Sequence, residues 1–304
     1  MKTLFFGTSE FAVPSLRVVA QKTDLQGAVT QPDREAGRGH RLQPTPVKRV
    51  ALDLGIKVFT PGSLAEFAAE CAIERYDLFV LASFGRILPK QLLDVPTLGS
   101  LNVHPSLLPQ YRGATPLQTA LRDGAVETGV TIMLMDAGMD TGDVVLQERT
   151  TIRDGEIYGD LHDRLAERGA VILGRALDLV RAGALPHSRQ HGEAGATRPL
   201  KKEDLFIDWN WPAARIANAV RAFSPRPGAR AILGGCSVKL EGVRPRDSKP
   251  GTGVSPGDIA GSSGDAAIVA CADGAVEIAR LTPANRAAMN GADFVRWLAN
   301  RGSP

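Results

Sequence analysis

The feature that most restricts the fold of this chain is a regular alternation of short apolar runs with helix-like segments over its first part. We expect strands at residues 2–6, 25–30, 56–59, 77–82, 100–103, 129–135 and 144–150, and helices at residues 10–21, 47–54, 65–75, 116–123 and 157–182. The strand at 77–82 is almost wholly apolar, as strands buried on both faces of a parallel sheet are. Strands that alternate with helices over short links predict an α/β fold with a doubly wound, mostly parallel sheet.

The opening of the chain is typical of a Rossmann-like unit, with a strand, a tight turn at Gly7 and then a helix. However, residues 7–11 lack the second and third glycines of the dinucleotide-binding fingerprint. The sequence therefore gives no support for a bound dinucleotide.

The pattern changes after residue 184. Residues 185–202 contain Gly, Pro, Ser, His and Ala without a period, which indicates a linker. A helix at 211–223 is followed by short strands at 231–233, 237–243, 267–270 and 275–281 between Gly and Pro turns, and by a closing helix at 292–298. This rhythm predicts a small β-barrel. We therefore expect a first domain at 1–184, a linker at 185–202 and a second domain at 203–304.

The composition is that of an ordinary globular protein. The 304 residues are 43% apolar and 23% charged, and the sequence shows neither a membrane-spanning run nor a signal-peptide pattern. The three cysteines are far apart and form neither a disulfide framework nor a metal motif. We expect a cytoplasmic protein with no membrane association. Residues 205–250 hold eight basic and three acidic residues, which favours a polyanion partner, although a surplus this small is more often a solvated face.

Polar side chains gather where two predicted strands end. Asn102 and His104 follow the strand at 100–103, and Asp140 lies in a Gly- and Asp-rich turn after the strand at 129–135. Open α/β sheets place their chemistry in such loops. A histidine exchanges a proton near neutral pH, and an amide can donate to an oxyanion. These residues form a candidate catalytic trio, although a His beside Pro is often a plain loop residue and an Asp before Thr-Gly is often a turn former.

Two further stretches are candidates for ligand contact. Phe84 and Ile87 follow the strand at 77–82 and could wall a flat ligand, with core packing as the alternative for each. Residues 31–46 have no periodicity, three prolines and three arginines, and they are long for a connection between a strand and a helix. Long loops of this kind are usually functional or disordered.

Several stretches of the chain together resemble one known family. They are residues 102–109 (NVHPSLLP), 111–113 (YRG), 140–143 (DTGD), 30–34 with 36–39, 127–133 and 221–229. The resemblance is to the folate-dependent formyltransferases, and within them to the group that acts on methionyl-tRNA. It runs nearly from end to end. The Asn, His and Asp set is specific for the superfamily, and the loop at 31–48 is more specific for the tRNA-acting group.

The resemblance implies a Rossmann-like catalytic domain followed by an OB-like barrel. It implies 10-formyltetrahydrofolate as donor and co-substrate, and the α-amine of methionine on initiator Met-tRNA as acceptor. It assigns catalysis to Asn102, His104 and Asp140, and folate contacts to Phe84, Gly85, Arg86, Ile87, Ser106, Leu107, Leu108 and Pro109. It assigns tRNA contacts to Arg34, Arg38 and Arg41. Residues 224–227 (SPRP) depart from the family pattern, which usually begins with Asn there, and this bears on tRNA contacts only.

The expected chemistry is acyl transfer between nitrogens. Asn102 and a protonated His104 would donate to the formyl oxygen, with Asp140 holding the imidazolium. The attacking amine would lose its proton to Asp140 or to a water that it orders. No metal and no covalent enzyme intermediate are needed, because the sequence offers neither a metal motif nor an activated nucleophile near the trio.

Other functions use the same residues. An N-formyltransferase for an amino sugar or a nucleotide would share the trio, but the loop at 31–48 argues against it. A formyl-folate hydrolase is a further alternative. A non-catalytic RNA-binding protein is disfavoured by the intact trio and by the net charge of only +4 over residues 200–304. No protein partner is implied.

Overall fold

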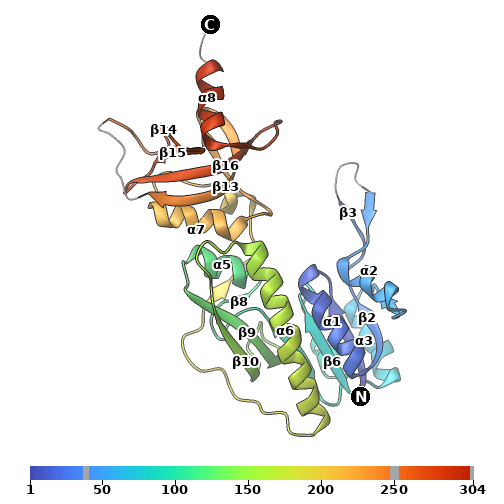
Figure 1. Ribbon diagram of the computed structural model, residues 1–304. Coiled ribbons are helices and arrows are strands. Elements are labelled where there is room, and N and C mark those ends of the chain that lie inside the picture. The colour runs from blue at the N-terminus through green and yellow to red at the C-terminus, as the bar shows by residue number, and fades with distance from the viewer. Residues whose placement is uncertain (37–40, 247–252, 302–304) are drawn as a thin grey trace. The chain divides into compact units, whose positions relative to one another are not determined.

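The computed structural model describes residues 1–36, 41–246 and 253–301, and it falls into two compact units (Figure 1). The first unit comprises residues 1–116, 127–151 and 162–198. The second comprises residues 117–126, 152–161 and those from 199 onward. Each unit is therefore assembled from several separate stretches of the chain.

The first unit is built on a seven-stranded sheet with the strand order β10-β9-β7-β6-β1-β2-β5. Its strands are β1 (Lys2–Gly7), β2 (Asp24–Val29), β5 (Val58–Phe59), β6 (Leu78–Ala82), β7 (Ser100–His104), β9 (Glu127–Leu134) and β10 (Val144–Thr151). The pairs among β5, β2, β1, β6 and β7 are parallel, whereas β9 is antiparallel to both β7 and β10. The expected doubly wound, mostly parallel sheet is confirmed, with an antiparallel pair of strands at one edge.

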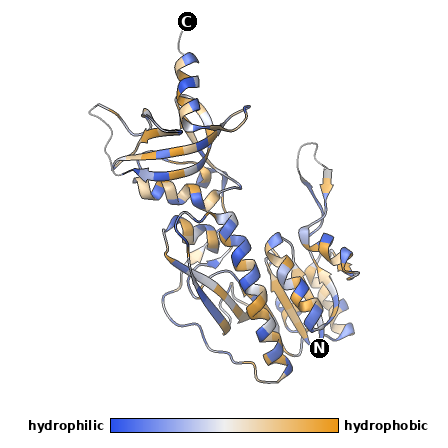
Figure 2. Cartoon of the chain, viewed as in Figure 1, coloured by the Kyte–Doolittle hydropathy of each residue, from blue (hydrophilic) through white to orange (hydrophobic). Residues whose placement is uncertain are grey.

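Helices cover both faces of this sheet, as the apolar runs require. They are α1 (Val13–Lys22), α2 (Pro46–Asp53), α3 (Leu64–Glu74), α4 (Lys90–Leu93) and α6 (Tyr158–Arg181), with the 3-10 turn η1 (Glu10–Ala12) before α1. Phe6 and Phe79 pack with side chains of α3 and α4 in one core cluster. On the other face, α6 approaches the sheet closely at Gly169, where a Cβ would lie 2.7 Å from Val103 Cγ1. Figure 2 shows the strands mostly hydrophobic and the helices two-faced.

The second unit carries an antiparallel sheet with the strand order β12-β13-β16-β15-β14. Its elements are α5 (Pro116–Arg122), which begins in the first unit, η2 (Lys202–Leu205), α7 (Ala213–Phe223), β12 (Ala229–Leu233), β13 (Cys236–Arg246), β14 (Ile259–Ser263), β15 (Ala266–Ala270), β16 (Ala275–Pro283), β17 (Met289–Asn290) and α8 (Gly291–Arg301). Strand β14 was absent from the sequence prediction because it is rich in small residues, and Gly261 within it has a φ of 135°. The antiparallel strand domain that we expected is confirmed.

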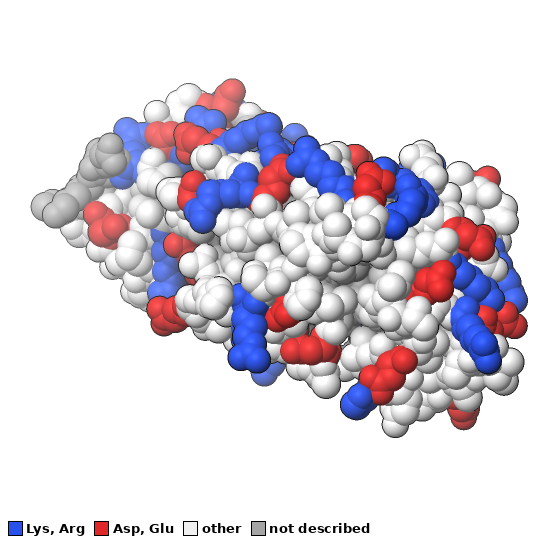
Figure 3. All heavy atoms as spheres, turned by 90° about the horizontal axis from the view of Figure 1, so that it is seen from below, with Lys and Arg blue, Asp and Glu red and all other residues white. Residues whose placement is uncertain are grey.

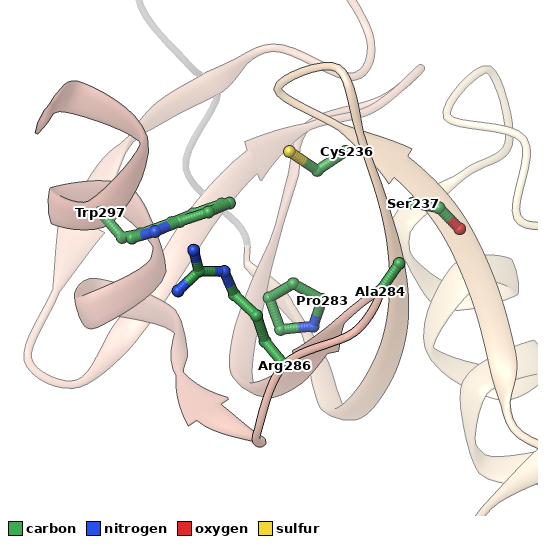
Figure 4. Close-up of a pocket in the computed structure, with 6 residues that line it drawn as sticks. All are labelled: Cys236, Ser237, Pro283, Ala284, Arg286 and Trp297. Carbon is green, nitrogen blue, oxygen red and sulfur yellow. The ribbon is translucent and has the colours of Figure 1, made fainter. Parts of the chain in front are cut away.

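A hollow of about 200 Å³ lies in the second unit (Figure 4). It is bordered by the start of β13, the end of β16 and α8. The Arg286 guanidinium lies 4.7 Å from the centroid of the Trp297 ring, and Figure 4 shows it pointing toward that ring. The arginine is therefore engaged by the aromatic side chain.

The segment at 31–46 differs from the expected aperiodic loop. It contains β3 (Arg34–Ala36) and β4 (Arg41–Gln43), which pair as an antiparallel ribbon that extends away from the sheet in Figure 1. The Asp33–Lys48 ion pair, at 2.8 Å, and the Thr30–Thr45 hydrogen bond, at 2.7 Å, tie the base of the ribbon together. Backbone pairing needs no apolar period, so the hydrophobic pattern gave no sign of it.

Of the stretch at 185–202, residues 185–198 belong to the first unit and residues 199–202 to the second. β11 (Ala196–Thr197) pairs in parallel with β8 (Arg112–Gly113), and Ser188 forms an isolated bridge with Val144. Among the described residues, no helix is both long and apolar enough to cross a membrane.

Candidate active site

The structure brings the three predicted catalytic residues together in the first unit. Asn102 and His104 lie two residues apart on β7, so their side chains emerge on the same side of the strand. Asp140 comes from the loop between β9 and β10. Its Oδ1 lies 3.5 Å from Asn102 Nδ2, and its Oδ2 lies 3.6 Å from His104 Nδ1. The two carboxylate oxygens of Asp140 are thus divided between the amide and the imidazole.

The tautomer of His104 follows from its contact with Tyr111. His104 Nε2 lies 3.1 Å from the Tyr111 carbonyl oxygen. Because a carbonyl oxygen can only accept, Nε2 must carry the hydrogen. In the neutral ring, Nδ1 then has a free lone pair and faces the Asp140 carboxylate.

Burial of His104 acts against the protonated ring that we expected. Burial lowers the pKa of His104 below its ordinary value of 6.5, against the opposing effects of the Asp140 charge and of the hydrogen bond to Tyr111. The residue is only 4% exposed, and removal from water disfavours the charged imidazolium. Burial thus favours the neutral ring, which can accept a proton at Nδ1, and Asp140 lies next to it to stabilise the imidazolium that forms.

Asp140 is held in an unusual backbone conformation. Its φ is 53°, a left-handed value that side chains other than Gly, Asn and Asp seldom adopt. The Gly113 N–H donates to Asp140 Oδ2 at 2.8 Å and so fixes the carboxylate. The next turn passes close to β9, where a Cβ on Gly142 would lie 1.9 Å from the Leu134 carbonyl oxygen. Only glycine fits that approach.

The predicted folate-contacting segment 106–109 is firmly fixed by the protein itself. The Ser106 hydroxyl donates to the Gln110 carbonyl at 2.6 Å, and the Leu108 N–H donates to Thr131 Oγ1 at 3.2 Å. Ser106, Leu108 and Pro109 are buried, whereas Leu107 is partly exposed. In this segment the Leu107 side chain is thus the most accessible to a ligand.

The second predicted folate-contacting segment, residues 84–87, is a turn after β6. The Phe84 ring is 4% exposed and packs edge-on against Phe6, so it belongs to the core. Gly85 has a φ of 76°, and the Arg86 guanidinium donates to the carbonyl oxygens of residues 61 and 62 at 2.9 and 3.1 Å. Ile87 is 76% exposed. The Ile87 side chain is therefore available to a ligand, whereas the Phe84 carbonyl already accepts from Thr8 and Gln31, each at 2.8 Å.

The predicted tRNA-contacting arginines lie on or beside the β3–β4 ribbon. Arg34 is exposed and donates to Gln31 Oε1, while Gln31 Nε2 donates to the Phe84 carbonyl at 2.8 Å. The base of the ribbon is therefore connected to the turn at 84–87. Arg41 begins β4, and its side chain is not described. Arg38 lies outside the described residues.

The sequence alone assigned no role to several groups that surround the trio, although residues 111–113 belong to a motif that carries the family resemblance. These groups are the Tyr111 carbonyl, the Gly113 N–H and the side chains of Arg112 and Gln190. Backbone groups leave no mark in a sequence, and Gln190 lies in a stretch without periodicity. Within the described ranges, no cluster of three or more His, Cys, Asp or Glu side chains is placed to hold a metal ion.

Comparison with known families identifies the family of the chain. Residues 1–177 match the model of the formyl transferases, and residues 199–298 match that of the formyl transferase C-terminal domain. The chain belongs to the formyl transferase family.

Three relatives illustrate the range of this similarity. The chain is 42% identical over 302 residues to the methionyl-tRNA formyltransferase of Xylella fastidiosa strain M12, covering 97% of each chain. The N-formyltransferase of Helicobacter canadensis, solved with folinic acid and dTDP-3-aminofucose, has a TM-score of 0.65 and 19% identity over 91% of this chain and 98% of its own. HypX of Aquifex aeolicus, solved with tetrahydrofolic acid, has a TM-score of 0.64 and 19% identity over 98% of this chain; the match spans 47% of HypX, about half its length. At this identity the two solved structures show a common fold.

We predict that His104→Ala and Asp140→Asn each lower kcat for formyl transfer by about 100-fold or more, because each removes part of the proton-accepting pair. Steady-state kinetics with varied folate donor should show little change in KM for that donor. Arg175→Ala, on an exposed position of α6, serves as a control and should keep kcat within about twofold of the parent. Near-normal kcat in both site variants would show that the pair is not catalytic.

We also predict that His104 stays neutral at pH 6.5 in the free protein. As the pH falls, burial delays protonation of His104, so its titration midpoint must lie below 6.5. Imidazole ¹⁵N NMR measures both protonation and tautomer, and a His104→Gln variant assigns the resonance. The neutral form should show the hydrogen on Nε2. A ring that is already charged at pH 7, or that carries its hydrogen on Nδ1, would contradict this assignment.

Proposed function

We infer that the protein transfers the formyl group of 10-formyltetrahydrofolate to the α-amino group of methionine on initiator Met-tRNA. The observation that carries this inference is the assembled Asn102, His104 and Asp140 trio, in a chain that matches a methionyl-tRNA formyltransferase over 97% of its length. The product is formyl-methionyl-tRNA, the form used to start translation.

The arrangement of the trio suits attack by an amine on a formyl carbon. As the new C–N bond forms, negative charge develops on the formyl oxygen, and the Asn102 amide is the donor within the trio that can bind it. The attacking amine gives up a proton to His104 Nδ1, and Asp140 stabilises the imidazolium. When the bond between the formyl carbon and N10 of the folate breaks, that proton is returned to the leaving nitrogen. Atoms and charge balance without a metal ion or a covalent enzyme intermediate.

The folate donor is supported by the position of the two partly fixed segments beside the trio. Residues 106–109 continue directly from β7, and residues 84–87 continue from β6, the neighbouring parallel strand. The carboxyl ends of adjacent parallel strands meet at one edge of a sheet, where open α/β folds bind their ligands. The partly exposed Leu107 and the exposed Ile87 are the apolar side chains that a flat ring would contact there.

The tRNA acceptor is supported by exposed arginines in both units. Arg34 projects from the β3–β4 ribbon, and Arg226, Arg230 and Arg244 are exposed in the second unit. On β12 and β13, Arg230 lies directly opposite Lys239. The face drawn in Figure 3 carries basic and acidic side chains interspersed. Recognition of a polyanion would therefore rest on local arginine contacts to phosphate rather than on one large positive field.

The proposed function is tested by comparing acceptors under one set of conditions. Purified protein with 10-formyltetrahydrofolate should formylate methionine on charged initiator tRNA. Transfer should be absent with uncharged tRNA, and an amino sugar or a sugar nucleotide should react far more slowly. Release of formate without an acceptor should be minor. Preferred transfer to an amino sugar, or rapid formate release, would replace the proposed function by a sugar N-formyltransferase or a hydrolase respectively.

We predict that Arg226→Ala combined with Arg230→Ala weakens tRNA binding and flattens its salt dependence. For every phosphate that an arginine no longer neutralises, the slope of log K against log salt should become shallower by about 0.9. Filter binding at a series of salt concentrations measures this, while folate affinity should stay unchanged. Arg17→Ala with Arg175→Ala, on exposed positions of α1 and α6, removes the same charge elsewhere and is the matched control. Equal slopes for the two double variants would exclude the assigned contacts.

A further inference from the structure

The loop that carries Asp140 must be held in place by its surroundings. Its backbone has a left-handed conformation at Asp140, and the position of the Asp140 carboxylate matters for catalysis. Asp140 has a left-handed φ of 53°, and its carboxylate must face both Asn102 and His104. A conformation of this kind persists only when its surroundings hold it in place. A displacement of about 1 Å at a reacting group can lower a rate about 100-fold.

The side-chain amide of Gln190 contacts the backbone of this loop on both sides of the turn. Gln190 Nε2 donates to the carbonyl oxygen of Asp140 at 2.8 Å and to that of Gly142 at 2.8 Å. Both hydrogens of the amide are thereby used. Gln190 is 50 residues from Asp140 in the chain, so this support comes from outside the loop.

The other end of the same amide binds Arg112. Gln190 Oε1 accepts from Arg112 Nε at 3.1 Å and from Arg112 Nη2 at 2.7 Å. Because the guanidinium can only donate and the two loop carbonyls can only accept, the orientation of the amide is fixed by its partners. All of its hydrogen-bonding capacity is directed to the Asp140 loop and to Arg112.

Arg112 leads back to the Asp140 carboxylate. The residue after it, Gly113, donates its N–H to Asp140 Oδ2 at 2.8 Å. The Arg112 N–H donates to the Gly195 carbonyl at 2.7 Å, and β8 pairs with β11 just beyond it. Gln190 itself lies between this pairing and the bridge from Ser188 to Val144. The contacts close a ring that fixes the backbone of Asp140 and the backbone donor to its carboxylate at the same time.

We propose that Gln190, together with Arg112, is a positioning residue that holds Asp140 against His104 during formyl transfer. It touches no reacting atom and acts through the placement of the Asp140 carboxylate. The proposal rests on the proposed function for its assay. It gives the stretch at 185–202 a part in the chemistry that its composition does not indicate.

The test uses Gln190→Met and Gln190→Glu in the full chain. Both variants keep the length of the side chain and remove the two donors to the loop carbonyls. Gln190→Glu also keeps an acceptor for Arg112, which allows the test if Gln190→Met does not fold. Each should lower kcat about 10-fold or more, with KM for folate and for Met-tRNA within about twofold. Arg189→Ala, on the exposed neighbouring residue, should match the parent.

A double-mutant cycle with Asp140→Asn separates positioning from general support of the fold. If Gln190 acts through Asp140, adding Gln190→Met to Asp140→Asn should lower kcat no further. Thermal unfolding of every variant should occur within a few degrees of the parent. Folded Gln190 variants with kcat within about twofold of the parent, or losses that multiply fully with that of Asp140→Asn, would overturn the proposal.

Measuring the activity of the parent protein separates a failure of this proposal from a failure of the proposed function. A parent that does not formylate Met-tRNA refutes the function. The ratio of variant to parent is then measured with the acceptor that the parent uses, and it decides the role of Gln190 by the same limits.

Discussion

Burial of one histidine between a carbonyl and a carboxylate is the constraint on which the rest of the site depends. The Tyr111 carbonyl determines which nitrogen of His104 carries the hydrogen, and burial lowers the pKa of the ring and so favours its neutral form. A neutral ring with Nδ1 toward Asp140 is a proton acceptor, whereas a charged ring would be a donor. The choice between these two roles is made by the surroundings of His104 and not by the residue itself.

The position of His104 beside Asn102 and Asp140 depends on the order and direction of the strands in the sheet. β7 brings Asn102 and His104 to one edge, and β9 runs antiparallel to it with Thr131 opposite His104. Because β9 runs antiparallel to β7, the loop that follows it returns toward Ser100, and the left-handed turn at Asp140 directs the carboxylate to the trio. The close passage at Gly142 lets the chain make this turn. β9 thus ends beside Leu101, at the other end of β7 from His104, and the loop after it brings Asp140 to the histidine.

The sequence predicted the parts of this structure that follow from periodicity and from strand ends. The strand at 77–82, the long helix beginning near residue 157 and the trio were all predicted from pattern and motif, and the structure places them as expected. The protonation of His104 was not predictable, since it depends on burial. The β3–β4 ribbon rests on backbone pairing, and the contacts of Gln190 join residues far apart in the chain. The spacing of hydrophobic residues predicts neither backbone pairing of this kind nor side-chain contacts between distant residues.

The second unit contains stretches from the first part of the sequence as well as the C-terminal part of the chain. Residues 117–126 and 152–161 belong to the second unit although they lie within the first part of the sequence. There the Arg221 guanidinium donates to the Glu156 carbonyl at 3.4 Å, and the Gly159 N–H donates to the Ser224 carbonyl at 3.1 Å. The Arg122 guanidinium also lies 5.8 Å from the Phe223 ring centroid. Truncation near residue 203 would remove these partners and expose apolar surface of α5, so weaker tRNA binding by a truncated chain would not distinguish a missing phosphate contact from a damaged fold. Substitution of the exposed Arg226 and Arg230 avoids this loss of packing and changes only the proposed contact to phosphate.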